Sequence, residues 1–367
     1  LETSAQRMDL FSEHKYSWQT SPIMIGYRQS LFGYNSLKWD KRIEPVRYQE
    51  AKKSYVETLE LVSANAINKF FALATAQSNY DIASFNYANA DTLYRYAQGR
   101  YNIGTITENE MLQLELNRLT EETNRMNARI EMDNCMQELR SYLGIQEERE
   151  IRVRVSSRIP DFSINLNEAL ALAYENSPDI QTMKRRKLES ESAVARARAN
   201  AGLKADIYLR FGLTQTADKL PEAYRNLLDQ QYVSLSISLP ILDWGRGKGQ
   251  VRVARSNRDL VYTQVEQNRT DFELNVRKLV KQFNLQTQRV RIAARTDETA
   301  QRRNEVARKL YILGKSTILD LNASISEKDS ARRNYVSALY NYWSLYYTLR
   351  SMTLYDFESN KLLTEDY

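Results

Sequence analysis

The chain has 367 residues, of which only 11 are Gly and 6 are Pro, and so few turn-forming residues predict long uninterrupted elements. Its 52 Lys and Arg exceed its 46 Asp and Glu, giving a net charge of +6, but the charges are scattered along helical stretches as solvated helix faces. The sequence contains no Lys/Arg cluster with interleaved aromatic residues, which a nucleic-acid-binding surface would need, so nucleic acid is not an expected partner.

Acid–base and metal chemistry have few candidate residues in this sequence. The single His14 lies in a polar segment typical of a loop, and the single Cys135 lies in a helical pattern as a small core residue with no partner for an intrachain disulfide. We therefore predict no catalytic, cofactor-binding or metal-binding residues and do not expect an enzyme.

The first elements along the chain are a strand and a pair of long helices. Ile23, Ile25 and Tyr27 alternate with polar residues, which is typical of a strand with one dry face. From Pro45 to Gly99 no further Gly or Pro interrupts the sequence, which predicts a long helix, and a turn at Gly104 precedes the next helix.

A second pair of strands, residues 206–214 and 232–240, shows stricter alternation. Each is about 8 to 10 residues long, the length that a tilted strand needs to cross a bilayer. A half-buried sheet in a soluble protein gives the same pattern. The apolar residues of the pair are Ile207, Leu209, Phe211, Leu213, Val233, Leu235, Ile237 and Leu239.

The longest segment without Gly or Pro lies between Gly249 and Gly314. Its 64 residues would span roughly 96 Å as one helix, which no compact globular domain requires. Apolar residues recur in it at spacings of three and four, a narrow stripe that predicts packing between antiparallel helices. The same absence of Gly and Pro continues from Gly314 to the end of the chain.

The chain contains an internal repeat. A shift of 210 residues superposes residues 30–143 on residues 240–353 without a gap, and matches at a constant offset over so many positions predict a duplicated unit. The second unit runs from about residue 164 to 353, and by symmetry about 100 residues of the first unit are expected before Leu1. The matches include Tyr101, Gly104 and Thr107 with Tyr311, Gly314 and Thr317.

The predicted hairpin has no large sheet or apolar helix of its own to cover its dry face. Either several protomers close a barrel or the dry face meets lipid, and an outer-membrane barrel satisfies both conditions. The sequence contains no run of 18 or more apolar residues, so it predicts no membrane-spanning helix.

Several motifs resemble those of the TolC-like outer-membrane efflux proteins. The segment NLNEALALAYENSPDI resembles the short opening helix of a repeat in that family. The corners SLPILDWGRGKGQV and QSLFGYNSLKWDKR resemble its passage from strand to long helix, and RYNIGTITENEML and LYILGKSTILDLN resemble its periplasmic tips. The resemblance covers nearly the whole chain and occurs twice, with the amino-terminal part of the first repeat missing.

The resemblance implies a mainly α fold with a membrane β-hairpin in each repeat. Long antiparallel coiled-coil helices would form a trimeric α-barrel, continuous with an outer-membrane β-barrel of twelve strands, four from each protomer. The implied segments are 1–35 (incomplete strands of the first repeat), 36–145 (its periplasmic helix pair), 146–163 (linker), 164–204 (opening helices of the second repeat), 205–242 (its hairpin), 243–353 (its periplasmic helix pair) and 354–367 (C-terminal tail).

The resemblance also implies functional residues at the two helical turns. In the family the residues beside each turn glycine meet a periplasmic adaptor (membrane-fusion) protein, which carries over to Ile103, Gly104, Thr105, Leu313, Gly314 and Lys315. A helix C-cap alone also explains the glycines, because Gly readily adopts the left-handed conformation that ends a helix.

By the same resemblance, acidic residues just beyond the turns would correspond to those that narrow the family's periplasmic mouth. Thr107 with Glu110, and Thr317 with Asp320, have the spacing of a capping box, which alone explains both acids. In the resemblance Glu110, Tyr311 and Asp320 line the constriction, and repulsion among three copies raises the pKa values of the acids. The chain departs from the family's pattern at Ser316 and Ala323, which argues against the family's ionic lock between helices, and Tyr311 with Lys315 is the substitute that the sequence offers.

The sequence is compatible with two functions. The first is an outer-membrane duct for efflux or secretion, with a periplasmic helical domain, a homotrimeric assembly, an adaptor, an inner-membrane pump and outer-membrane lipid as its partners. The alternative is a soluble coiled-coil scaffold that docks partner helices. The serine-lined strand 233–239 favours the duct, because a scaffold does not need it.

Overall fold

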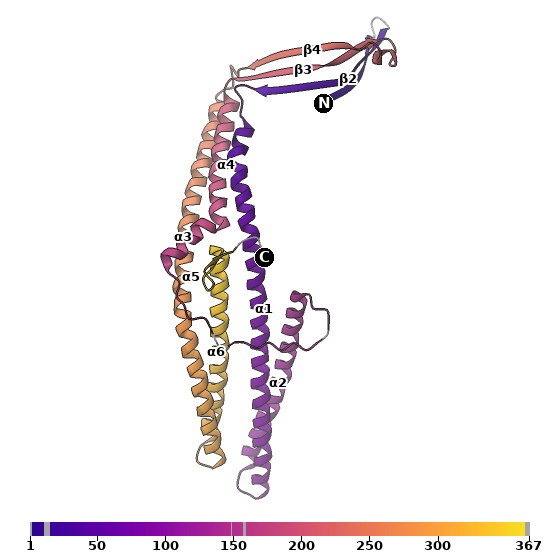
Figure 1. Cartoon of the computed structure of the whole chain (residues 1–367). Coiled ribbons are helices and arrows are strands. Elements are labelled where there is room, and N and C mark those ends of the chain that lie inside the picture. Colours follow the sequence, from indigo (N-terminus) through magenta and orange to yellow (C-terminus); the bar gives the residue numbers. More distant parts are fainter. Residues whose placement is uncertain (1, 11–14, 148, 157–158, 364–367) are drawn as a thin grey trace. The chain divides into compact units, whose positions relative to one another are not determined.

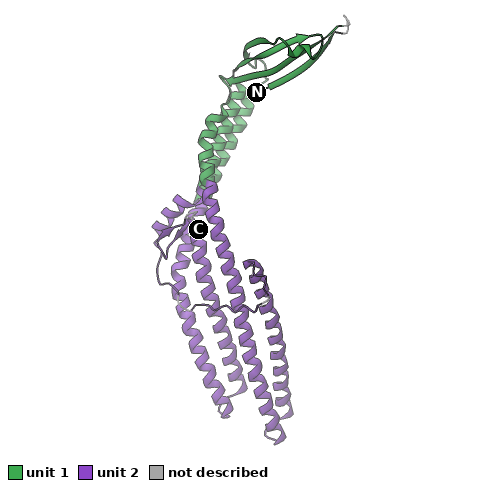
Figure 2. Ribbon diagram, turned by 45° about the vertical axis from the view of Figure 1, so that its right-hand side comes forward, with its two compact units in different colours: residues 1–49, 181–269 green, residues 50–180, 270–367 purple. Residues whose placement is uncertain are grey.

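The computed structural model describes residues 2–10, 15–147, 149–156 and 159–363, so His14 lies outside the described residues. These residues divide into two compact units (Figure 2). Unit 1 comprises Leu1–Gln49 and Gln181–Arg269, and unit 2 comprises Glu50–Ile180 and Thr270–Tyr367. Each unit contains residues from both sequence repeats. The two compact units therefore do not coincide with the seven segments expected from the sequence, and those segments stay a prediction.

Unit 1 contains a four-stranded antiparallel sheet in the order β1-β2-β3-β4 (Figure 1). The strands are β1 (Glu2–Leu10), β2 (Lys15–Ser30), β3 (Lys204–Ala217) and β4 (Leu228–Ser238), and a 3-10 turn, η1 (Glu222–Tyr224), lies in the β3–β4 connection. The hairpin predicted for the second repeat is confirmed. Its strands are longer than predicted at the β3–β4 connection, and β4 ends one residue before Leu239.

The pairing register gives the sheet two chemically different faces. Tyr27, Leu209 and Val233 form one row across three strands, and Ile25 pairs with Phe211 in the neighbouring row of the same face. Because side chains alternate along a strand, the residues between them lie on the other face, which is mostly polar. The strict alternation predicts this division, and a one-residue slip would reverse it for a whole strand.

Strand β2 contains an irregularity that the alternation rule does not foresee. Its pairing with β3 shifts between Thr20 and Ile23, where Pro22 has no backbone N–H for the ladder. Thr20 is buried, and its hydroxyl donates to the carbonyl oxygen of Ala223 in η1. At this irregularity the hydrogen bond from Thr20 therefore holds the β3–β4 connection against β2.

Three helices of unit 1 accompany the sheet: the first turns of α1 (Ser36–Asn102), most of α4 (Pro178–Ala201) and the first turns of α5 (Arg246–Ile312). The hydroxyls of Tyr34 and Ser192 lie 2.6 Å apart. Lys187 of α4 and Glu266 of α5 form an ion pair of 2.8 Å. Such partly exposed pairs contribute at most about 1 kcal/mol each, so apolar packing must supply most of the stability.

Unit 2 is a set of long helical hairpins (Figure 1). It combines the remainder of α1 and α5 with α2 (Glu108–Leu143), α3 (Leu166–Asn176) and α6 (Ile318–Thr353). Leu73 of α1 packs with Met132 and Leu139 of α2. On α5 the ring of Phe283 lies 5.2 Å from that of Tyr342 on α6, centroid to centroid. The apolar stripe predicted for helix packing thus forms the core of this unit.

A short C-terminal clasp, residues 354–363, closes unit 2 and was predicted only as a tail. It contains β5 (Tyr355–Asp356) paired with β6 (Lys361–Leu362). Leu354 and Leu363 pack against Val56 of α1. Beneath the clasp, Arg350 forms ion pairs with Glu60 of α1, at 2.9 Å, and with Asp356, at 3.4 Å.

The helical lengths of the two repeats agree residue for residue. Helices α1 and α5 each have 67 residues, and α2 and α6 each have 36. At 1.5 Å per residue the longer helices span roughly 100 Å. The predicted fold class, mainly α with paired strands and long antiparallel helices, is confirmed. Among the described residues, no helix combines the length and the apolar character that crossing a bilayer requires.

Candidate functional sites at the helix turns and on the sheet

The first helical turn reverses the chain at Gly104. Helix α1 ends at Asn102, and Gly104 adopts a left-handed conformation with φ of 72°. The amide of Gly104 donates to the carbonyl oxygen of Tyr101 and that of Thr105 to Arg100, each at 2.9 Å. These two bonds satisfy carbonyl groups that the end of the helix leaves without partners.

The second turn repeats this geometry in α5 and α6. Gly314 has φ of 70°, its amide donates to Tyr311 at 3.0 Å, and the amide of Lys315 donates to Leu310 at 2.9 Å. Ile103 and Leu313 precede the two glycines and expose 74% and 67% of their surfaces. Each turn therefore presents one large apolar side chain on a fixed backbone.

Both turns lead into a capping box, as the spacing predicts. The hydroxyl of Thr107 accepts from the amide of Glu110 at 3.3 Å, and the Glu110 carboxylate accepts from the amide of Thr107 at 3.1 Å. Thr317 and Asp320 make the same exchange at 3.2 and 3.4 Å. Each box pairs two amides at a helix start and places a carboxylate where the helix dipole favours it.

The left-handed glycine gives a stability test with an internal control. Gly104→Ala places a Cβ on a left-handed residue and is expected to lower the free energy of unfolding by about 1–2 kcal/mol. Gly99→Ala, five residues earlier in α1, should instead raise it by about 0.5–1 kcal/mol. An added Cβ meets no atom within 4 Å at either position. Urea unfolding of both variants measures the difference, and shifts of the same sign would contradict the assignment.

Of the three residues predicted to line a constriction, the structure brings two together. Glu110 and Tyr311 line one cavity of about 330 Å³, whose lining also includes Arg100, whereas Asp320 is not part of that lining. Burial raises the pKa of Tyr311, the charge of Arg100 opposes the rise, and that of Glu110 adds to it. Among the described residues no hydrogen bond or ion pair joins Tyr311 to Lys315. The pair therefore does not replace the family's ionic lock within one chain.

Within one chain, hydroxyl groups surround the carboxylate of Asp320. Its carboxylate accepts from the hydroxyl of Thr317 at 2.8 Å and from that of Ser316 at 3.3 Å. Hydrogen bonds from Thr317 hold the pKa of Asp320 below its usual value. Any rise in the pKa of Asp320 from neighbouring copies would have to exceed the effect of these hydrogen bonds, and it stays a prediction about the trimer.

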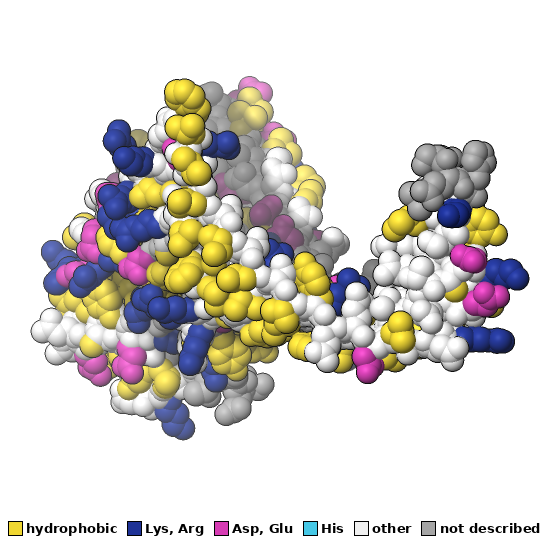
Figure 3. Space-filling view, turned by 90° about the horizontal axis from the view of Figure 1, so that it is seen from above, with side chains coloured by type: hydrophobic (Ala, Val, Ile, Leu, Met, Phe, Trp, Pro, Cys, Tyr) yellow, Lys and Arg dark blue, Asp and Glu magenta, His cyan; other side chains and the backbone are white. Residues whose placement is uncertain are grey.

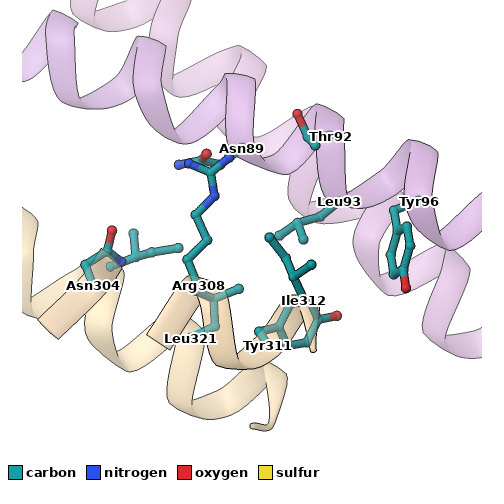
Figure 4. A pocket seen from close by; sticks show the side chains of 10 residues that line it. Asn89, Thr92, Leu93, Tyr96, Asn304, Arg308, Tyr311, Ile312 and Leu321 are labelled. Atoms are coloured by element: carbon teal, nitrogen blue, oxygen red, sulfur yellow. The ribbon is translucent and has the colours of Figure 1, made fainter. Parts of the chain in front are cut away.

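A second cavity near the turns lies between the two repeats. It has a volume of about 220 Å³ and is mostly apolar (Figure 4). Ile312 of α5 points toward Leu93 of α1, and Arg308 reaches toward Asn89 (Figure 4). Sequence reasoning missed this cavity, because its walls are more than 200 residues apart and no local pattern links them.

The apolar face of the sheet is open along the hairpin of the second repeat. Val233, Leu235 and Ile237 expose 70%, 58% and 65% of their surfaces, and Phe211 is also exposed. Ile207, Leu209 and Leu213 are half-buried, and Leu239 is exposed beyond the end of β4. In Figure 3, hydrophobic and uncharged surface dominates the visible strands, and charged side chains gather toward one end of them.

The corner between β4 and α5 presents further apolar side chains. Trp244 exposes 96% of its surface, and its backbone has φ of 50°, which is unusual for a bulky residue. The Asp243 carboxylate holds the turn by accepting from the amides of Gly247 at 2.8 Å and Gly245 at 3.0 Å. These bonds also lower the pKa of Asp243. Ile241 and Leu242, close to Trp244 in the chain, are also exposed. Leu31 and Phe32, at the equivalent positions of the first repeat, are exposed as well.

Comparison with known proteins places this architecture. The chain is similar to the CmeC outer membrane channel of Campylobacter jejuni, with a TM-score of 0.78, 15% identity and coverage of 100% of this chain and 78% of that chain. It is similar to the outer membrane protein VceC of Vibrio cholerae, with a TM-score of 0.74, 15% identity and coverage of 96% and 85%. It is also similar to the open state of the MtrE outer membrane channel of Neisseria gonorrhoeae, with a TM-score of 0.74, 13% identity and coverage of 96% and 79%.

At these identities the structural similarity shows the fold alone. A search of curated protein sequences found no match to the chain. Among the described residues no cluster of His, Cys, Asp and Glu could hold a metal ion.

The profile of the family described as outer membrane efflux protein matches residues 169–353, half of the chain. The chain belongs to the outer membrane efflux protein family.

Proposed function

We propose that three copies of the chain form a passive duct for efflux or secretion through the outer membrane. Family membership implies the outer membrane and an efflux role without enzymatic activity. The observation that supports the duct most directly is the four-stranded sheet, whose apolar face is open and whose other face is mostly polar. Lipid outside and water inside would match these two faces.

Closure of the barrel would require other protomers. The sheet has two free edges, at β1 and at β4, and exposed strand edges pair readily with other strands. Three sheets of four strands joined edge to edge would leave no backbone group without a partner in lipid. The lipid-facing set would then be Ile207, Leu209, Phe211, Leu213, Val233, Leu235 and Ile237, with Leu239 and the corner residues at the membrane interface, where aromatic residues are enriched.

The two turns are the proposed contacts for a periplasmic adaptor coupled to an inner-membrane pump. Ile103 and Leu313 offer exposed apolar side chains, and Gly104, Thr105, Gly314 and Lys315 fix the backbone beside them. Few rotamers must be ordered on binding at such preformed turns, which favours docking. Glu110, Tyr311 and Asp320, within a few residues of the turns, are the proposed lining of the constriction.

The oligomeric mass in detergent and the conductance of the purified protein test this proposal. We expect light scattering to give about three times the chain mass of 42.9 kDa, with extraction only by detergent, and planar bilayers to show discrete channel openings. A monomer or dimer that is soluble without detergent would contradict the duct and favour the coiled-coil scaffold.

A further inference from the structure

The polar face of the sheet carries more cations than anions. The register places the bases Lys15, Arg28, Lys204 and Arg210 on this face with the acids Glu2 and Asp206, a surplus of two positive charges among the described strand residues. Strand β4 adds only uncharged residues to it, among them Ser234, Ser236 and Ser238. The face is therefore polar because of serines and tyrosines, and charged mainly because of arginines and lysines.

Two arginines are diagonal neighbours on this face, one on β2 and one on β3. Arg210 pairs in register with Gly26, and Arg28 pairs with Tyr208 in the adjacent row. Gly26 contributes no side chain beside Arg210, and a Cβ there would come within 3.3 Å of the Tyr208 hydroxyl. The rings of Tyr208 and Tyr232 meet edge to face, 6.2 Å apart. The register thus places each arginine opposite a tyrosine, Arg28 opposite Tyr208 and Arg210 opposite Tyr232.

Neither arginine is fully neutralised within the chain. Arg28 lies 3.7 Å from Asp206, with 73% of its side chain exposed, so water screens this pair. The Nε atom of Arg210 is buried and has no hydrogen-bond partner in the described structure. A guanidinium keeps its charge in proteins and presents a planar fork of donors that suits anionic groups.

We infer that Arg28 and Arg210 form an anion-preferring section of the duct, which would favour cargo with carboxylate, phosphate or sulfonate groups. This inference rests on the proposed function, because it requires the polar face to line the lumen. Twelve strands about 4.8 Å apart and tilted by about 40° enclose a lumen with a backbone radius of roughly 12 Å. Three copies of the pair would place six guanidinium groups around it.

The size of such a lumen makes these charges effective. Arginine side chains extend inward from the backbone, so an ion on the axis lies closer to the guanidinium groups than the roughly 12 Å backbone radius. That separation is comparable to the Debye length of about 10 Å at 0.1 M salt and exceeds the 3 Å found at 1 M. The preference for anions should therefore be strong at low salt and fade at high salt.

The reversal potential of single channels tests the inference. In KCl near 0.1 M, where charges are screened much less than at 1 M, replacing both residues (R28Q with R210Q) should lower the chloride-to-potassium permeability ratio about threefold. Asp206→Asn removes an anion from the same face and should raise the ratio. Arg149→Gln, which removes an exposed linker charge paired with Glu147, should leave it unchanged. The acidic mouth is common to all these channels, so differences between them report the sheet.

The outcomes separate this inference from the proposed function. Channels that conduct with the same permeability ratio in wild type, R28Q/R210Q and D206N would overturn the inference and leave the duct intact. Absence of conductance in the wild-type protein would overturn both. If R28Q/R210Q does not assemble, R28K/R210K and D206N still decide, because the lysine variant should keep the wild-type ratio and D206N should exceed it.

Discussion

Replacing Arg350 with Met is expected to lower the free energy of unfolding by about 3–5 kcal/mol, because the change leaves a buried carboxylate without its counter-charge. Glu60 exposes 6% of its side chain and Arg350 12%, and the Nη2 atom of Arg350 donates to Glu60 Oε1 at 3.0 Å. Methionine fills much of the same volume, so the loss would come from the unpaired charge of Glu60. Denaturant unfolding monitored by circular dichroism measures it.

An exposed ion pair in the same unit is the matched control for this variant. Arg291 pairs with Asp161, and both side chains are about two-thirds exposed, at 65% and 68%. Arg291→Met should change stability by less than about 1 kcal/mol, because water already solvates both charges. Equal losses in R350M and R291M would show that the buried pair has no special role in holding the C-terminal clasp to α1.

Gly212→Ala is expected to prevent normal assembly of the sheet, with at least a tenfold loss of detergent-extracted oligomer. A Cβ at Gly212 would collide with the carbonyl oxygen of Ile23 and lie 2.9 Å from the Cα of Met24, both backbone atoms of β2. Backbone cannot give way as a flexible side chain can, so the strands would have to separate. Such overpacking typically costs about 1–3 kcal/mol and here involves the ladder itself.

Gly26→Ala is the control, because it lies in the neighbouring strand on the same face. An added Cβ there meets only the Tyr208 side chain, its hydroxyl at 3.3 Å, which can turn aside. Oligomer yield close to wild type is expected for G26A, measured by size-exclusion chromatography of equal membrane extracts. Wild-type yield for G212A as well would mean that β2 and β3 are not packed as closely as described.

The features that the sequence predicts well are those set by nearby residues. The turns at Gly104 and Gly314 and their capping boxes depend on residues within one turn of helix, so spacing alone reveals them. The alternation in β3 and β4 is equally local. Strand β1, by contrast, has no consistently apolar face in Glu2–Leu10, and β2 breaks its own period at Pro22. An edge strand with a polar pattern leaves little signal for a rule based on periodicity.

The features that the sequence could not predict join distant parts of the chain. The cavity lined by Glu110 and Tyr311 brings Leu93 together with Ile318, and an ion pair beneath the clasp joins Glu60 to Arg350, at separations of more than 200 residues. The repeat could point to equivalent positions in the two halves, but it carries no information on which faces of the helices meet. Tertiary packing decides those pairs, and a single sequence does not record them.

The equal helix lengths in the two repeats limit which insertions and deletions the chain can tolerate. One residue added to a helix advances its end by about 1.5 Å and rotates it by about 100°. Adding a residue to α5 alone would move Leu313 and Gly314 out of step with Ile103 and Gly104, which α1 would still hold in place. Length changes would have to occur in both repeats together, or in multiples that restore the helical phase. Substitutions of side chains could therefore accumulate in evolution while the lengths of the long helices stayed nearly constant.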